Sequence, residues 1–235
     1  PPKLRPNPVS RLGPSMARRK RNRRNLGPLV ALALIVGLAV VVGRGDLFAL
    51  LRPEPHPLAL SARACLTALT EQGADFTALG DIRRDRGCAI ANAVQVDRFA
   101  GVELNAPLLA SCPLALATVR YLERVVQPAA ADHLSRSVIA LEHRGGFSCR
   151  SVRGLNGGPL SEHAYANAID VFKFVLEDGL PVTVEHRWDG GNGTGAFLAE
   201  VGRRAGRHYS TVLGPDDDAR HADHFHLGLG RPRRR

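Results

Sequence analysis

Two stretches decide how this chain is interpreted: Ser161-Glu162-His163-Ala164-Tyr165-Ala166-Asn167-Ala168-Ile169-Asp170 and His221-Ala222-Asp223-His224-Phe225-His226. A single histidine in a protein is usually a surface residue or a satisfied core residue. Here three histidines fall within six residues, and they follow a histidine and an aspartate that are seven positions apart. This concentration of imidazole and carboxylate groups predicts a metal site.

Zinc is the ion that such a set of donors favours. It accepts imidazole nitrogen and carboxylate oxygen, and its catalytic sites have three protein ligands and an open position for water. We expect His163, Asp170 and His226 to be these ligands. With only one negatively charged ligand on a divalent ion, ionisation of water near neutral pH is favoured, which suits a hydrolytic reaction.

The catalytic base is expected among the residues just before His226. A strand is predicted over residues 223–229, and side chains two positions apart on a strand share a face. His224 would then point the same way as His226, whereas Asp223 would face away unless the strand is bulged. We therefore expect His224 to be the general base or to stabilise an oxyanion, ahead of Asp223. His221, on the preceding loop, is a further catalytic candidate that could turn back toward the site.

The elements around these stretches predict an α+β domain. Apolar residues recur at helical spacing over 61–70 and 113–133, and a third helix fits 195–207. Runs rich in Val, Ile or Phe predict strands at 137–141, 168–176 and 181–188, in addition to 223–229. Helices before and between strands that are mainly joined as hairpins indicate one small antiparallel sheet with flanking helices.

The first 60 residues differ in composition from the rest. Residues 1–25 hold nine Lys or Arg and no Asp or Glu, and residues 26–43 form an 18-residue stretch without charge. We expect a basic cytoplasmic segment at 1–25, a transmembrane signal anchor at 26–43 and a proline-rich linker at 44–60. A cleaved signal peptide is the alternative to the anchor. In both cases the domain at 61–230 is expected in the periplasm, with the anchored form attached to the inner membrane.

The positive charge is concentrated at the two ends. Of the 32 Lys and Arg residues, nine lie in 1–25 and four in a basic tail at 231–235, which leaves 19 against 22 acidic residues. The body is therefore slightly acidic, and the basic runs contain no interleaved aromatic residues. We expect no binding to nucleic acid.

The four cysteines are far apart: Cys65, Cys88, Cys112 and Cys149. Without a C-x-x-C pair, a cysteine zinc site is not expected. An even number of cysteines in an exported chain predicts two disulfides, and the sequence leaves all three connectivities open. The alternative is that at least one cysteine is a free buried thiol.

The two stretches resemble the S-x-H-x-x-G-x-A-x-D and H-x-x-H-x-H signatures of the zinc peptidase superfamily that contains D-alanyl-D-alanine metallopeptidases and murein endopeptidases. More narrowly, the chain resembles the bacterial extensin-like C-terminal domain family over residues 65–229, through further matches at Cys112-Pro113, Gln127-Pro128-Ala129-Ala130, Cys149-Arg150 and Val212-Leu213-Gly214-Pro215. Two positions depart from the pattern. Ala166 replaces the motif glycine, and Asp223 stands where many superfamily members have a glutamate.

The resemblance implies a zinc D-Ala-D-Ala-peptidase-like fold of the hedgehog/peptidase type, in which His163, Asp170 and His226 bind the ion. It also implies that Arg150 holds a carboxylate or carbonyl of the substrate, a role that a guanidinium fork suits better than an ammonium group.

The expected function is that of a zinc-dependent peptidase that cleaves peptide bonds in peptidoglycan stem or crosslink peptides, as a carboxypeptidase or endopeptidase. A non-catalytic zinc-containing wall-binding module is the alternative, and a structural envelope protein without metal is another. The expected partners are peptidoglycan peptides and, through the anchor, the membrane. An unregulated wall hydrolase endangers its cell, so a regulatory protein partner fits this function, although no residue identifies one.

Overall fold

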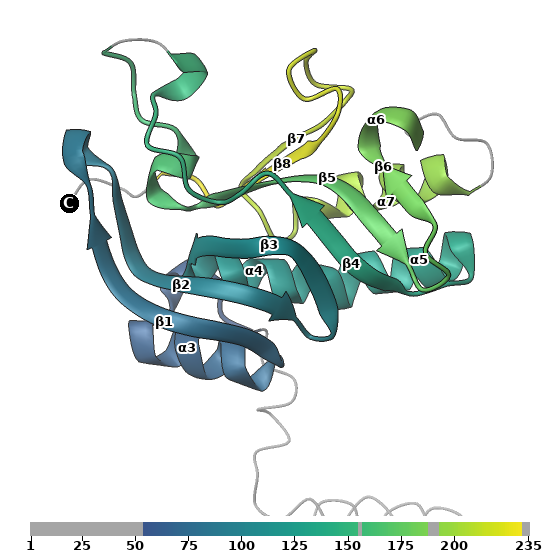
Figure 1. The fold of residues 1–235 in the computed structure, drawn as a ribbon, viewed down its shortest axis with the longest axis horizontal. Coiled ribbons are helices and arrows are strands. Elements are labelled where there is room, and N and C mark those ends of the chain that lie inside the picture. The colour runs from purple at the N-terminus through teal and green to yellow at the C-terminus, as the bar shows by residue number, and fades with distance from the viewer. Residues whose placement is uncertain (1–53, 155–156, 188–192, 232–235) are drawn as a thin grey trace, which may run out of the picture. The chain divides into compact units, whose positions relative to one another are not determined.

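The computed structural model describes residues 54–154, 157–187 and 193–231 (Figure 1). The chain divides into two units, Pro1–Glu54 and Pro55–Arg235. The predicted basic segment at 1–25 and the predicted anchor at 26–43 lie outside the described residues. Within the described part of the chain, no helix has the length and apolar character needed to cross a membrane.

The folded unit is built on one eight-stranded sheet, in the order β1-β2-β3-β4-β5-β8-β7 with β6 beside β5. The strands are β1 (Ala74–Arg83), β2 (Ala89–Phe99), β3 (Val102–Ser111), β4 (Val138–His143), β5 (Ala168–Leu176), β6 (Pro181–Thr183), β7 (Thr211–Leu213) and β8 (Phe225–Gly228). Neighbouring strands are antiparallel except for the parallel pair β3 and β4. The fold is α+β as predicted, but the prediction of a small antiparallel sheet was wrong because the sheet is larger and mixed.

The long strands β1 to β3 account for most of this difference. Strand β1 is exposed at most of its positions, so its sequence lacks the apolar alternation that identifies a half-buried strand. The predicted strand at 181–188 was also too long. It ends at Thr183, and the helix α6 (Val184–Arg187) follows.

The principal helices are α3 (Ala62–Glu71), α4 (Cys112–Tyr121), α5 (Gln127–Leu134) and α7 (Thr194–Ala205). Their buried side chains form one apolar core with those of the sheet, among them Leu69, Leu116 and Phe197. The helix predicted at 113–133 is confirmed, with a π-helical turn at Leu122–Val126 between α4 and α5. Pro128 explains this turn, since proline has no N–H to continue the regular hydrogen-bond ladder.

The end of the predicted linker packs against the folded unit. Pro57 is buried and begins the short 3-10 helix η1 (Pro57–Ala59). The guanidinium of Arg120 donates a 3.0 Å hydrogen bond to the carbonyl oxygen of Pro55. These contacts place the start of the folded unit a few residues before the predicted boundary at residue 61.

Both predicted disulfides are present and no cysteine is free. Cys65–Cys112 joins α3 to the start of α4, inside the core. Cys88–Cys149 joins the end of the β1–β2 hairpin to the segment that follows β4. A native disulfide of this kind typically contributes about 2–4 kcal/mol by restricting the unfolded chain.

Candidate metal centre

Strand pairing brings two of the three predicted ligands together. Strands β5 and β8 are antiparallel neighbours, and Asp170 is the register partner of His226. Residues directly opposite each other on such a pair place their side chains side by side on one face. Sequence positions 56 residues apart therefore become neighbours through the sheet.

The third ligand comes from a short turn that leads into β5. His163 lies in the 3-10 helix η5 (Glu162–Tyr165). Ser161 caps the start of this helix, and its hydroxyl accepts a hydrogen bond from the backbone N–H of His163. The helix ends at Ala166, which has the left-handed backbone angle φ 49°. Glycine adopts this conformation without steric cost, whereas the Cβ of Ala166 makes it less favourable.

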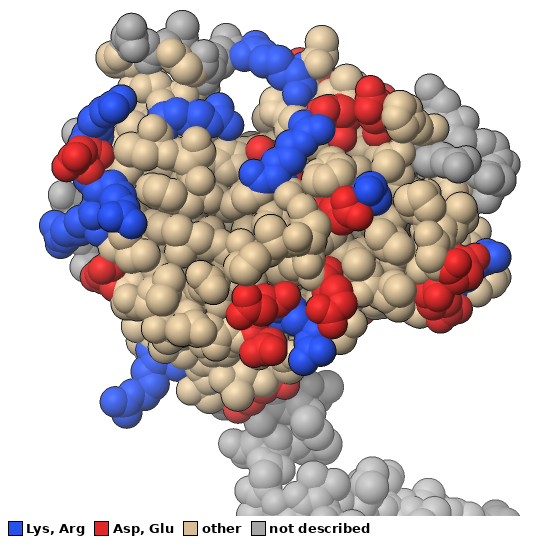
Figure 2. Space-filling view, viewed as in Figure 1, with Lys and Arg blue, Asp and Glu red and all other residues tan. Residues whose placement is uncertain are grey.

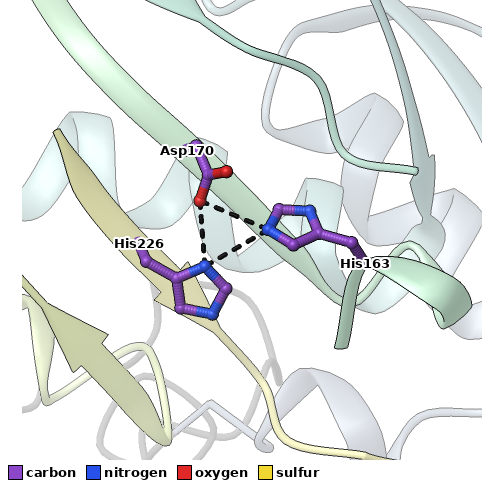
Figure 3. A group of neighbouring side chains, drawn as sticks. All are labelled: His163, Asp170 and His226. Carbon is purple, nitrogen blue, oxygen red and sulfur yellow. Dashed lines mark hydrogen bonds and ion pairs between the residues drawn. The ribbon is translucent and has the colours of Figure 1, made fainter. Parts of the chain in front are cut away.

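The three ligand side chains converge on one point (Figure 3). Oδ1 of Asp170 lies 2.9 Å from Nδ1 of His226 and 3.3 Å from Nε2 of His163. The two nitrogens are 3.2 Å apart. A tetrahedral zinc ion with bonds of about 2.0–2.1 Å has ligand atoms roughly 3.3 Å from one another. The three donor atoms are therefore close enough to one another to hold one metal ion together.

The outer nitrogen of each histidine has an acceptor of its own. Nδ1 of His163 lies 3.3 Å from the carbonyl oxygen of Gly146, and Nε2 of His226 lies 3.2 Å from Oε2 of Glu162. The other nitrogen of each ring faces the common point, and it offers a lone pair there when the outer nitrogen carries the only ring proton. Metal-binding histidines almost always have such partners, because the partner fixes the tautomer and the orientation of the ring.

Glu162 is a functional residue that sequence reasoning missed. Its other carboxylate oxygen accepts a 2.8 Å hydrogen bond from the hydroxyl of Thr211 on β7. Glu162 precedes His163 in the sequence, but its contact with His226 depends on the pairing of β8 with β5. No local pattern indicates that contact.

The electrostatics of the site favour a cation. Burial raises the pKa of Asp170, but hydrogen bonds with His163 and His226 outweigh it and hold the pKa well below its usual range. Glu162 behaves in the same way, since the contacts with His226 and Thr211 overcome the effect of burial and lower its pKa. Burial alone would lower the pKa of His226, yet Asp170 and Glu162 raise it to about 9. Two ionised carboxylates thus face two imidazoles, and all four side chains are largely buried.

A second group of side chains adjoins the ligands. Nδ1 of His224 lies 2.7 Å from Oδ1 of Asp223, and Nε2 of His224 lies 3.8 Å from Oδ1 of Asp170. Arg144 forms a 2.5 Å ion pair with Oδ2 of Asp223. Nη1 of Arg144 is also 3.5 Å from Nδ1 of His224, and the shorter contact with Asp223 decides that Nδ1 carries the proton.

The predicted roles of these residues are only partly reproduced by the geometry. His224 does face the ligands, although it precedes β8 and is not a strand residue. Asp223 was expected to face away from the ligands unless the strand is bulged. Asp223 lies in the turn before the strand, so the alternation of faces does not apply to it. Its pKa is lowered to about 2, first by the hydrogen bond with Arg144 and then by that with His224. Arg144 itself was not predicted.

His221 and Arg150 also border the site. The ring centre of His221 lies 5.1 Å from that of His224 and 5.9 Å from that of His226, and its Nδ1 is 2.8 Å from Oδ1 of Asp218. Together with the ligands, His221 and Arg150 line a cavity of about 500 Å³. All the residues predicted for metal binding, catalysis and substrate binding therefore lie at one cavity or next to it.

A comparison with known protein families identifies one family that matches this chain. The family model described as "Extensin-like protein C-terminus" matches residues 63–235, which include the three ligands, Arg150 and all four cysteines. Neither the curated proteins nor the solved structures include a match.

Proposed function

The chain belongs to the extensin-like protein C-terminus family, and we propose that it is a zinc-dependent peptidase that cleaves peptide bonds in peptidoglycan stem or crosslink peptides. The observation that carries this proposal is the convergence of His163, Asp170 and His226 within 4.8 Å, with an acceptor behind each histidine. Zinc held by these side chains would polarise a substrate carbonyl and lower the pKa of water. The motif resemblance to zinc peptidases that act on the bacterial cell wall supports peptidoglycan as the substrate.

His224 is the general base of the proposed reaction. Because its Nδ1–H donates to Asp223, its Nε2 is an acceptor directed toward Asp170 and the metal centre. In this position Nε2 takes a proton from the attacking water as the water oxygen bonds to the carbonyl carbon. The same proton then passes to the departing amine as the C–N bond breaks, so the products are a carboxylate and an amine.

Asp223 and Arg144 position this base. The carboxylate of Asp223 fixes the tautomer of His224 and favours its protonated form during the reaction. Arg144 keeps Asp223 ionised through the ion pair between them. His221, whose ring centre lies 5.1 Å from that of His224, steadies the negative charge that develops on the carbonyl oxygen.

The disulfides support the proposed location. Structural disulfides persist in oxidising compartments such as the periplasm and are rare in the cytosol. The two bridges of this domain therefore fit a periplasmic position, with residues 26–43 as the proposed anchor in the inner membrane.

Metal content and cleavage measured on one preparation test the proposal. The full chain is compared with His224→Ala and with a matched control, His133→Ala, which removes an exposed imidazole on α5. We expect about one zinc per chain in all three proteins, and release of new peptides from crosslinked muropeptides by the full chain and the control only. Zinc with saturable muropeptide binding but no products would instead indicate a wall-binding module. Absence of zinc would refute the metal site.

A further inference from the structure

A second cavity of about 680 Å³ adjoins the metal cavity. Arg150 and Arg231 line both cavities, so the two share part of a wall. The second cavity extends away from the ligands toward the end of the β1–β2 hairpin, where Arg86 lines it. Its remaining wall comes from the segment 157–160, Tyr165 and the residues around Cys149. We call it the arginine basin.

The described residues that line the arginine basin carry positive charge only. Arg86, Arg150 and Arg231 line it, and no Asp or Glu does. Among the residues that the structure describes, none of these three guanidinium groups has a carboxylate within ion-pair distance. Figure 2 shows Lys and Arg side chains gathered on the upper left of this face, where the hairpin end and the segment after β4 lie in Figure 1.

Covalent and backbone links hold the arginine basin at a set position relative to the metal centre. The disulfide Cys88–Cys149 joins the hairpin turn that carries Arg86 to the segment that carries Arg150. The carbonyl oxygen of Arg150 accepts a 3.0 Å hydrogen bond from the backbone N–H of Ser161, two residues before the ligand His163. The separation between the basin and the ligands is therefore built into the fold.

We propose that the arginine basin binds a free carboxylate of the peptide whose neighbouring amide bond is cleaved at the metal centre. This inference rests on the proposed function for the orientation of the peptide. A guanidinium fork binds a carboxylate through two parallel hydrogen bonds, and a substrate carboxylate would pair with guanidinium groups that have no carboxylate partner among the described residues. The substrate class is thus an acidic peptide with a free carboxylate, rather than any neutral peptide that fits the cleft.

Binding of two matched ligands tests this proposal without turnover. The zinc-loaded full chain carrying His224→Ala is titrated by calorimetry with a crosslinked muropeptide and with the same muropeptide after amidation of its carboxyl groups. We expect the carboxylate form to bind roughly tenfold more tightly. In the same background, Arg86→Gln and Arg231→Gln should each reduce this preference to about threefold or less. Both arginines are exposed, so neither variant threatens the fold.

Arg84→Gln is the matched control, since Arg84 lies on the same hairpin turn, is exposed and lines neither cavity. It removes the same charge and should leave the tenfold preference intact. Equal binding of the two muropeptides overturns the proposal, and so does a preference that Arg86→Gln and Arg231→Gln leave unchanged. If the chain with His224 intact binds with the expected preference but cleaves nothing, the peptidase fails while the arginine basin is supported.

Discussion

Oε2 of Glu162 lies 3.2 Å from Nε2 of His226, on the far side of the ring from the Nδ1 that faces Asp170. The carboxylate therefore orients the ligand without approaching the point where the three donors meet. Glu162 thus orients a candidate ligand, whereas its neighbour His163 is itself a candidate ligand. Sequence position alone does not distinguish these two roles, because the two residues are adjacent in the chain.

Glu162→Gln should weaken zinc binding by roughly 10- to 100-fold while the fold is retained, since partners of this kind contribute about that much to metal affinity. The amide oxygen can still accept the proton of His226, but the negative charge is lost. Competition with a chromophoric chelator measures the affinity. Glu71→Gln, at an exposed position on α3, is the control and should bind zinc like the unaltered chain. An unaltered affinity in Glu162→Gln would show that this carboxylate does not support the ligand.

Gly228→Ala should reproduce much of that loss through packing alone. A Cβ at Gly228 would overlap Oε2 of Glu162 and lie 3.3 Å from Cβ of Thr211, so the carboxylate must move away from His226. The double variant Glu162→Gln/Gly228→Ala should then lose little more affinity than either single variant, because both remove one interaction. Gly206→Ala serves as the control, since its Cβ would meet no atom. Strictly additive losses would argue against a shared cause.

Removal of the metal should lower the melting temperature. A ligand that binds only the folded state at a hundredfold excess over its Kd adds about 2.7 kcal/mol of stability, or roughly 5–10 °C for a domain of this size. A chelator should therefore shift the unfolding curve of the full chain by about that amount. It should not shift the curve of His163→Ala, which lacks a ligand. A chelator effect of the same size in His163→Ala would place the metal elsewhere.

Asp223→Asn should reduce kcat at least about tenfold, with KM and zinc content close to those of the unaltered chain, because the charge that supports protonated His224 is removed. Steady-state cleavage of a muropeptide, combined with metal analysis, separates these quantities. The control is Asp132→Asn, at an exposed position on α5. A variant with full kcat would leave Asp223 without a positioning role.

His208 should make the domain less stable in acid. Burial first, and then the charge of four nearby arginines, lowers the pKa of His208 to about 4. As the pH falls below about 6.5, His208 becomes protonated in the unfolded chain, but in the folded chain it stays neutral until about pH 4. The free energy of unfolding therefore decreases across this interval.

His208→Gln should lose less stability than the unaltered chain between pH 7 and pH 4.5. We expect a difference of about 1–2 kcal/mol, after allowance for screening by solvent at this partly exposed position. Urea unfolding at the two pH values measures it, and His133→Gln, at an exposed histidine of α5, is the control. Parallel losses in His208→Gln and the unaltered chain would assign the acid sensitivity to other groups.

The elements that the sequence predicted well are those with strong local patterns. The strand at 168–176 was placed at its observed bounds, and the helix predicted at 195–207 is observed at Thr194–Ala205. His163, Asp170 and His226 could be selected as candidate metal ligands because few types of side chain carry an imidazole or a carboxylate group. Two disulfides were predicted from an even number of cysteines in a chain that was expected to be exported.

The tertiary structure alone decided which distant residues meet. The choice of Cys65–Cys112 and Cys88–Cys149, the parallel pairing of β3 with β4 and the contacts made by Glu162 and Arg144 all join positions far apart in the chain. Hydrophobic periodicity and residue chemistry are local properties, and they identify elements and candidate donors. Contacts such as that between Glu162 and His226 depend on strand order and register, which are set by the packing of the whole core and leave no local pattern in the sequence.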